Sequence, residues 1–161
     1  MSFVPEAYGL VGNASMMFRD GQLWLNGGGL INTFFGEYRA SLIRVVANER
    51  PQEVKIYDGA RVICTRKISS PRQRIEPSEM YPNGMLSRTT RNNVTGVEGD
   101  WWLPFFRDLT DPSYPGDPLR ALQAGRALRG HYLILDIEID SDETAVFSLV
   151  DIATSKSSNT R

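Results

Sequence analysis

Residues 132–140 read Tyr-Leu-Ile-Leu-Asp-Ile-Glu-Ile-Asp, and residues 144–152 continue with Thr-Ala-Val-Phe-Ser-Leu-Val-Asp-Ile. In the first stretch aliphatic and acidic residues alternate, which indicates a β-strand with one buried face, because successive side chains of a strand point to opposite sides. The second stretch follows the polar turn 141–143. The pattern predicts a C-terminal antiparallel hairpin whose outer face is acidic. That face carries Asp136, Glu138 and Asp140.

Three further stretches have the composition of strands. Residues 15–25 and 54–65 each place an Asp-Gly pair between two apolar runs, at residues 20–21 and 58–59. Asp-Gly supplies the positive φ angles of a type I′ turn, so each stretch predicts a hairpin. Residues 38–47 are rich in β-branched and apolar residues and predict a single strand.

The middle of the chain is rich in proline. Seven of the nine prolines lie between residues 69 and 118. Proline has no N–H for a sheet ladder, so we expect residues 69–116 to form a long irregular excursion. Asp117 and Pro118 then have the pattern of a helix N-cap and first turn, and predict one short helix over about 118–128 that ends before Gly130.

Together these features predict a mainly β fold, an antiparallel β-sandwich or a small barrel with one short helix. At 161 residues and 18.1 kDa, the chain can bury a core of its own. We expect a single domain, residues 1–161. Its parts are β-hairpins (1–68), the proline-rich excursion (69–116), the helix with the C-terminal hairpin (117–153) and a polar tail (154–161).

Composition excludes several classes of site. The net charge is −1, so no overall field steers the chain to nucleic acid or to a membrane. A single cysteine, Cys64, and a single histidine, His131, exclude an internal disulfide and the common zinc clusters. We therefore expect no cofactor, no metal and no membrane segment. The N-terminus has no export signal, and we expect the protein to be cytoplasmic when it is made.

Charge is segregated along the chain. Residues 39–91 hold eleven basic residues against five acidic ones, whereas residues 132–152 hold six acidic residues and no basic one. The two blocks either pair within the chain and face solvent, or join copies of the chain head to tail. Arginine is enriched at protein interfaces. The candidate interface arginines are Arg61, Arg66, Arg72, Arg74, Arg88 and Arg91.

Residues 101–106 form the densest aromatic cluster, within the proline-rich excursion. Such a cluster either pins the excursion to the sheet as a satellite core or anchors a partner protein. The candidate anchors are Trp101, Trp102, Phe105 and Phe106.

Residues for catalysis are sparse. The acidic face of 132–140 has the spacing of a solvated sheet face rather than of a cation site, and no serine or cysteine has the setting of a nucleophile. These features favour a non-enzymatic subunit that works through protein contacts. One alternative is a barrel module that binds single-stranded nucleic acid through the basic block. Another is a hydrolase or metal-dependent enzyme whose pocket gathers His131 with some of the acidic residues.

A family resemblance agrees with the first hypothesis. Residues 42–48 (Leu-Ile-Arg-Val-Val-Ala-Asn), 54–60 (Val-Lys-Ile-Tyr-Asp-Gly-Ala) and 62–65 (Val-Ile-Cys-Thr) resemble a pattern of small β-sandwich virion proteins of tailed phages. The resemblance implies a structural role in a capsid, neck or tail, with no catalytic residues. The implied partners are copies of the chain or other structural proteins, and the implied location is a virus particle.

Overall fold

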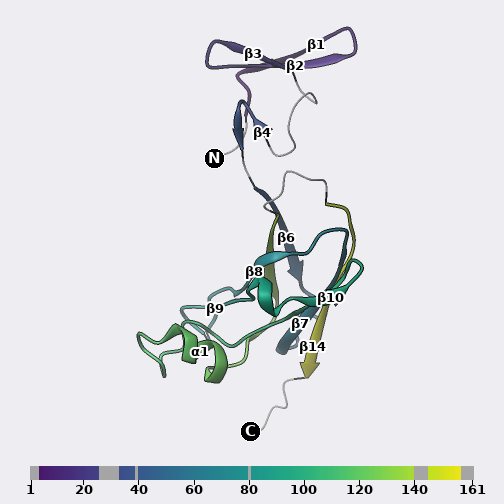
Figure 1. Ribbon diagram of the computed structural model, residues 1–161. Helices are drawn as coiled ribbons and strands as arrows, with labels where there is room; N and C mark the ends of the chain where they lie inside the picture. Colours follow the sequence, from purple (N-terminus) through teal and green to yellow (C-terminus); the bar gives the residue numbers. More distant parts are fainter. Residues whose placement is uncertain (1–3, 26–32, 39, 80, 140–144, 157–161) are drawn as a thin grey trace. The chain divides into compact units, whose positions relative to one another are not determined.

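The computed structural model describes residues 4–25, 33–38, 40–79, 81–139 and 145–156. The fold is mainly β, with several open antiparallel sheets and one short helix (Figure 1). This confirms the predicted fold class, while the described strands close no barrel. Contacts divide the chain into two compact units, residues 1–41 with 140–144 and residues 42–139 with 145–161. The single domain over 1–161 stays a prediction.

The first unit holds two small sheets. Strands β1 (Ala7–Val11), β2 (Ala14–Arg19) and β3 (Gln22–Leu25) form an antiparallel meander. Asp20 and Gly21 join β2 to β3 with φ angles of 53° and 75°. The hairpin predicted at this Asp-Gly pair is therefore confirmed. Strands β4 (Thr33–Phe34) and β5 (Glu37–Tyr38) form a separate two-stranded ribbon.

The second unit contains a five-stranded and a four-stranded sheet. The five-stranded sheet runs β10 (Thr95–Val97), β11 (Asp100–Pro104), β7 (Lys55–Cys64) and β12 (Arg129–Gly130), with β14 (Phe147–Lys156) also paired to β7. The four-stranded sheet runs β6 (Ser41–Ala47), β13 (Leu133–Ile139), β8 (Ser69–Ile75) and β9 (Met85–Arg88). The strand predicted over residues 38–47 is confirmed as β6.

A shared core joins these two sheets as a sandwich. Val62 and Leu103 from the five-stranded sheet and Leu135 and Ile137 from the four-stranded sheet belong to one buried cluster and have no exposed surface. The alternation of residues 132–140 therefore identified the buried face correctly. A second cluster consists of Tyr57, Ile75, Met85, Leu128 and Leu133.

The predicted C-terminal hairpin is wrong in its pairing. Strand β13 pairs with β8, whereas β14 pairs with β7 in the other sheet. Both strands direct aliphatic side chains toward the same core, but from opposite layers of the sandwich. Alternation shows which face of a strand is buried and not which strand lies beside it, so a hairpin and a sandwich have the same local pattern.

The predicted turn at Asp58-Gly59 is also wrong, because β7 passes through both residues as one strand of ten residues. Neither residue has a positive φ angle. Gly59 is needed for another reason. A Cβ atom there would lie 2.5 Å from the ring of Trp102, which covers this position. The glycine makes room for the indole of the adjacent strand.

Residues 69–116 were expected to be irregular, but they contain β8, β9, β10 and β11 and a short 3-10 helix at Arg91–Asn93. Pro71 lies inside β8 and Pro104 ends β11. Their carbonyl groups still accept hydrogen bonds, from Thr89 N at 3.0 Å and from Thr89 Oγ1 at 2.7 Å. Proline removes a donor but leaves the acceptor, so these two prolines remain compatible with strands.

The single helix α1 (Pro118–Ala124) starts as predicted. Asp117 is the N-cap, and its Oδ1 accepts from Arg120 N at 3.1 Å. The helix ends at Gly125, earlier than expected. Leu128 lies beyond the helix in the core, and is only 1% exposed. Of the predicted polar tail, residues 154–156 belong to β14 and residues 157–161 lie outside the described part.

Candidate functional site

Trp102 lies on the outer face of the five-stranded sheet. In the strand register it sits between Thr95 of β10 and Arg61 of β7. Its ring covers Gly59, yet 41% of the residue remains exposed. The backbone of β11 thus fixes the position of a large aromatic side chain that is still accessible from solvent.

A charged pair lies beside the indole. Arg61 donates to both carboxylate oxygens of Asp100, with Nε 2.9 Å from Oδ1 and Nη2 2.7 Å from Oδ2. These hydrogen bonds hold the pKa of the Asp100 carboxyl below its usual value. Asp151 of β14 lies directly opposite Arg61 and adds a second negative charge. Asp100 therefore holds the planar guanidinium in place, and Asp151 adds a favourable charge interaction.

Aliphatic side chains complete this surface. Leu149 of β14 lies opposite Ile63 of β7, and Val97 of β10 lies opposite Asp100. Leu149 is 40% exposed and Val97 is 74% exposed. We call this surface the Trp102 face. It consists of Arg61, Ile63, Val97, Asp100, Trp102, Leu149 and Asp151.

The predicted aromatic cluster is divided between two surfaces, because Trp101 and Trp102 are successive residues of a strand. Trp101 points inward, packs against the core and donates its Nε1–H to Cys64 O at 3.0 Å. Phe105 packs against both core clusters. Phe106 is half-buried. The satellite-core hypothesis fits Trp101 and Phe105. Trp102 is the one strongly exposed residue of the four, and the anchor hypothesis applies to it.

The predicted basic and acidic blocks meet on the outer face of the four-stranded sheet. Arg44 of β6 holds Asp136 of β13 through two hydrogen bonds, Nε to Oδ1 at 2.7 Å and Nη2 to Oδ2 at 3.0 Å. This contact lowers the pKa of Asp136. Arg72 lies 3.6 Å from Glu138. These carboxylates therefore have partners within the chain.

The other candidate interface residues with charged side chains differ from one another in their partners. Arg74 pairs with Glu76 at 3.1 Å. Arg88 of β9 lies opposite Arg72, and neither it nor Arg91 forms an ion pair with another described residue. Arg66 is exposed and has an interaction of its own. Asp140 lies outside the described residues.

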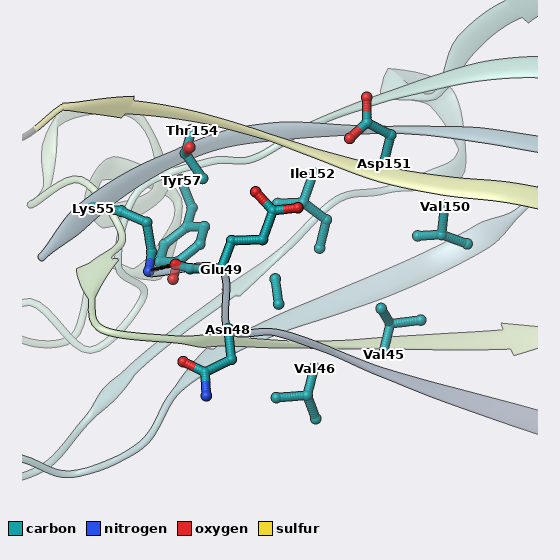
Figure 2. A pocket seen from close by; sticks show the side chains of 11 residues that line it. Val45, Val46, Asn48, Glu49, Lys55, Tyr57, Val150, Asp151, Ile152 and Thr154 are labelled. Carbon is teal, nitrogen blue, oxygen red and sulfur yellow. Dashed lines mark hydrogen bonds between the residues drawn. The ribbon is translucent and has the colours of Figure 1, made fainter. Parts of the chain in front are cut away.

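A cavity of about 170 Å³ lies between β6 and β14 (Figure 2). Val45 and Val150 face each other across it, and Lys55 donates from Nζ to the carbonyls of Glu49 and Arg50. The hydroxyl group of Tyr57 is buried there, and no described residue forms a hydrogen bond with it. Burial raises the pKa of Tyr57 to about 12. The buried Tyr57 hydroxyl therefore provides a hydrogen-bonding position in this cavity.

A second cavity of about 360 Å³ lies beside His131. Glu76 and Glu79 line it together with His131. His131 Nδ1 lies 3.0 Å from Pro51 O. Within the described residues no cluster of three or more His, Cys, Asp or Glu side chains could hold a metal ion. The cavity therefore places His131 near two acidic residues, and the hypothesis of a hydrolase or metal-dependent enzyme stays a prediction.

Sequence reasoning missed a buried ionic network. Asp108 has no exposed surface and accepts from Leu86 N at 3.1 Å, from Thr110 N at 3.0 Å and from Arg126 Nη2 at 3.1 Å. Asp111 accepts from Ser113 N at 2.9 Å and from Arg126 N at 2.6 Å. Both aspartates accept from the backbone two residues ahead. Asp-x-Thr and Asp-x-Ser are sequence signals of such turns and could have revealed them.

The described residues include no helix that is long and apolar enough to cross a membrane.

Comparison with protein families finds a match for one segment of the chain. Residues 29–108 match the model of the Crassvirus muzzle protein C-terminal domain. This segment is similar to that domain of the muzzle protein. The muzzle segment contains β4 to β11, and so includes Trp102, Arg61 and Asp100. A search of curated proteins finds no match.

The match confirms the resemblance to virion proteins of tailed phages. The chain is thus a structural component of a tailed-phage particle. The muzzle segment ends before α1, so β13 and β14, which complete the two sheets of the sandwich, lie outside it.

Proposed function

We propose that this chain is a non-enzymatic subunit that joins neighbouring structural proteins of the phage particle, and that the Trp102 face is its main contact surface. The observation that carries this proposal is the exposed indole of Trp102 beside the Arg61–Asp100 pair. Tryptophan and arginine dominate the energetics of protein interfaces. The family supplies the setting, a virion structural component in the neck or tail.

Two properties of the Trp102 face favour protein contact. Its central aromatic residue is fixed by Gly59 and by the strand register, so binding costs little side-chain entropy. Its charges are of both signs, and Arg61 is already oriented by Asp100. A partner can therefore bury the aliphatic residues and the indole without breaking the ion pair.

The outer face of the four-stranded sheet is a weaker candidate. Its predicted acidic residues Asp136 and Glu138 are paired with Arg44 and Arg72 of the same sheet. Head-to-tail joining of copies through these charges would require these pairs to open. We therefore place the contact surface at the Trp102 face.

The test is hydroxyl-radical footprinting of the free chain and of intact phage particles. Trp102 should be oxidised in the free chain and protected several-fold in the particle. Trp101 is the matched control, because it is the same residue type and points into the core, so its oxidation should stay low in both states. Equal oxidation of Trp102 in both states, or absence of the chain from particles, would contradict the proposal.

Binding to single-stranded nucleic acid is the alternative, and Arg88 and Arg91 give it its main support, because neither is paired with another described residue. The ring of Tyr81, which is an aromatic residue near this block, is already covered by the guanidinium of Arg126 at 5.3 Å. Anisotropy of a labelled oligonucleotide separates the two functions. Binding that falls steeply with salt would favour nucleic acid, and no binding at low salt would exclude it.

A further inference from the structure

One face of the β1–β2–β3 sheet is formed by apolar residues alone. The register pairs Ala7 with Phe18 and Phe18 with Leu23, so these three side chains share a face. Counting every second residue along each strand gives the rest of that face. We call it the apolar face, and it consists of Ala7, Gly9, Val11, Ala14, Met16, Phe18, Leu23 and Leu25.

Large side chains on this face are open to solvent. Leu23 is 67% exposed, Val11 65% and Leu25 54%. No described residue of the first unit is buried. A small antiparallel sheet is marginally stable unless one of its faces packs against something, so this face lacks the cover that such a sheet needs.

The opposite face of the same sheet is different. It carries the polar residues Arg19 and Gln22, and also Trp24 and the strongly exposed Tyr8 and Leu10. The chain itself covers part of that face, because the rings of Trp24 and Phe35 meet edge to face at 5.7 Å and the guanidinium of Arg19 lies 4.9 Å from Phe35. The apolar face differs from it in carrying no polar or charged side chain, which makes it the better candidate for an apolar contact.

We infer that the apolar face binds the same face of a second copy of the chain. The face has no charge, so two identical faces do not repel each other. Its residues also differ in size across the sheet. Ala7 and Gly9 lie on β1, whereas Leu23 and Leu25 lie on β3. A two-fold axis parallel to the strands places the large side chains of β3 over the small ones of β1 in the other copy.

The size of the contact predicts its strength. Three strands about 4.8 Å apart and about five residues long, at roughly 3.4 Å per residue, give a face of only a few hundred Å². Stable interfaces bury about 1,200 Å² or more in total. We therefore expect a reversible dimer of the free chain at high micromolar concentration, reinforced where many copies are held together in a particle.

This inference rests on the proposed function, since it gives the assembling subunit a second contact surface, but its test does not depend on phage particles. Light scattering after size-exclusion chromatography gives the mass of the full chain up to about 1 mM. The mass should rise from 18.1 kDa toward twice that value with concentration. It should not fall in high salt, because the contact is uncharged, and sulfate should increase it.

Variants locate the contact. Leu23→Glu puts a charge on the apolar face and should weaken dimerisation by at least about tenfold. Leu10→Glu is the matched control, because Leu10 is also a strongly exposed leucine of this sheet, at 76%, but lies on the opposite face. It should dimerise like the unchanged chain. Circular dichroism should show the same β content for both variants.

Three results would overturn the inference. The first is a mass of 18.1 kDa at every concentration. The second is an equal loss of dimer in both variants. The third is a melting temperature of the monomer lowered by Leu23→Glu and not by Leu10→Glu, which would show that the chain's own residues cover the face. Protection of Trp102 in particles together with a strict monomer in solution would leave the proposed function intact and remove only this inference.

Discussion

At the scale of single residues, Asp108 carries the most interactions of any buried polar side chain that the structure describes. Its carboxylate connects the backbone of β9, the turn at Thr110 and the guanidinium of Arg126. We expect Asp108→Ala to destabilise the protein by about 3 kcal/mol, because it leaves several donors without a partner. Urea unfolding followed by circular dichroism measures the change.

Asp58→Ala is the control for this substitution. Asp58 is an exposed aspartate of β7, and only its backbone carbonyl accepts a hydrogen bond, from Phe105 N at 3.0 Å. Its replacement should change the free energy of unfolding by less than about 0.5 kcal/mol. Equal effects of the two substitutions would show that the network around Asp108 does not stabilise the fold.

Tyr57 gives a prediction about alkaline pH. Its pKa of about 12 lies above the ordinary value of 10.0, so the folded state keeps the proton that the unfolded state loses. The contribution of Tyr57 to stability is therefore constant below pH 10 and is lost as the pH rises from 10 toward 12.

Tyr57→Phe should remove this dependence. The buried hydroxyl has no partner, so its loss at pH 7 should change stability by no more than about 1 kcal/mol, toward greater stability. Between pH 10 and 11 the variant should become progressively more stable than the unchanged protein. Urea unfolding at pH 7, 10 and 11 tests this. A difference in the free energy of unfolding between the two proteins that is the same at all three pH values would contradict it.

At the scale of elements, the contact between β7 and β11 positions the Trp102 face. A Cβ atom at Gly59 would meet the Trp102 ring at 2.5 Å and Leu103 O at 2.9 Å. We expect Gly59→Ala to cost about 1–3 kcal/mol and to push the indole off the sheet. Tryptophan fluorescence quenching by iodide should increase.

The control is the double variant Gly59→Ala with Trp102→Ala. Removing the ring relieves the main clash, so the added methyl group should cost less in this background than in the unchanged chain. The same cost in both backgrounds would indicate that Leu103 O, and not the indole, is the atom that excludes a side chain at position 59.

At the scale of the whole molecule, the two core clusters predict that the second unit folds without the first. Every buried residue of both clusters lies between residues 57 and 137. A chain of residues 41–161 should therefore keep its β-type circular dichroism and a cooperative thermal transition. Loss of that transition would show that residues 1–40 are required for the sandwich.

Much of this molecule was predictable from local patterns. The Asp20-Gly21 turn, the strand at 38–47, the N-cap at Asp117 and the buried face of residues 132–140 each depend on residues close together in the chain. The wrong predictions share a cause as well, namely contacts between residues that are distant in the sequence. Asp58-Gly59 has the sequence of a turn, but the glycine is needed because Trp102, distant in the sequence, packs against it. Pro71 and Pro104 fit into strands because their carbonyls accept hydrogen bonds from Thr89, and this partner lies far from both in the sequence.

The sequence by itself therefore determined the β class, the single helix and the likeness to phage virion proteins, because composition and short-range periodicity express them. Only the tertiary structure decided which strands are neighbours. That pairing sends Trp101 into the core and Trp102 to the surface, and it brings Arg44 to Asp136 across 92 positions of the chain. Contacts of such long sequence separation depend on how two layers stack, and no local pattern encodes this.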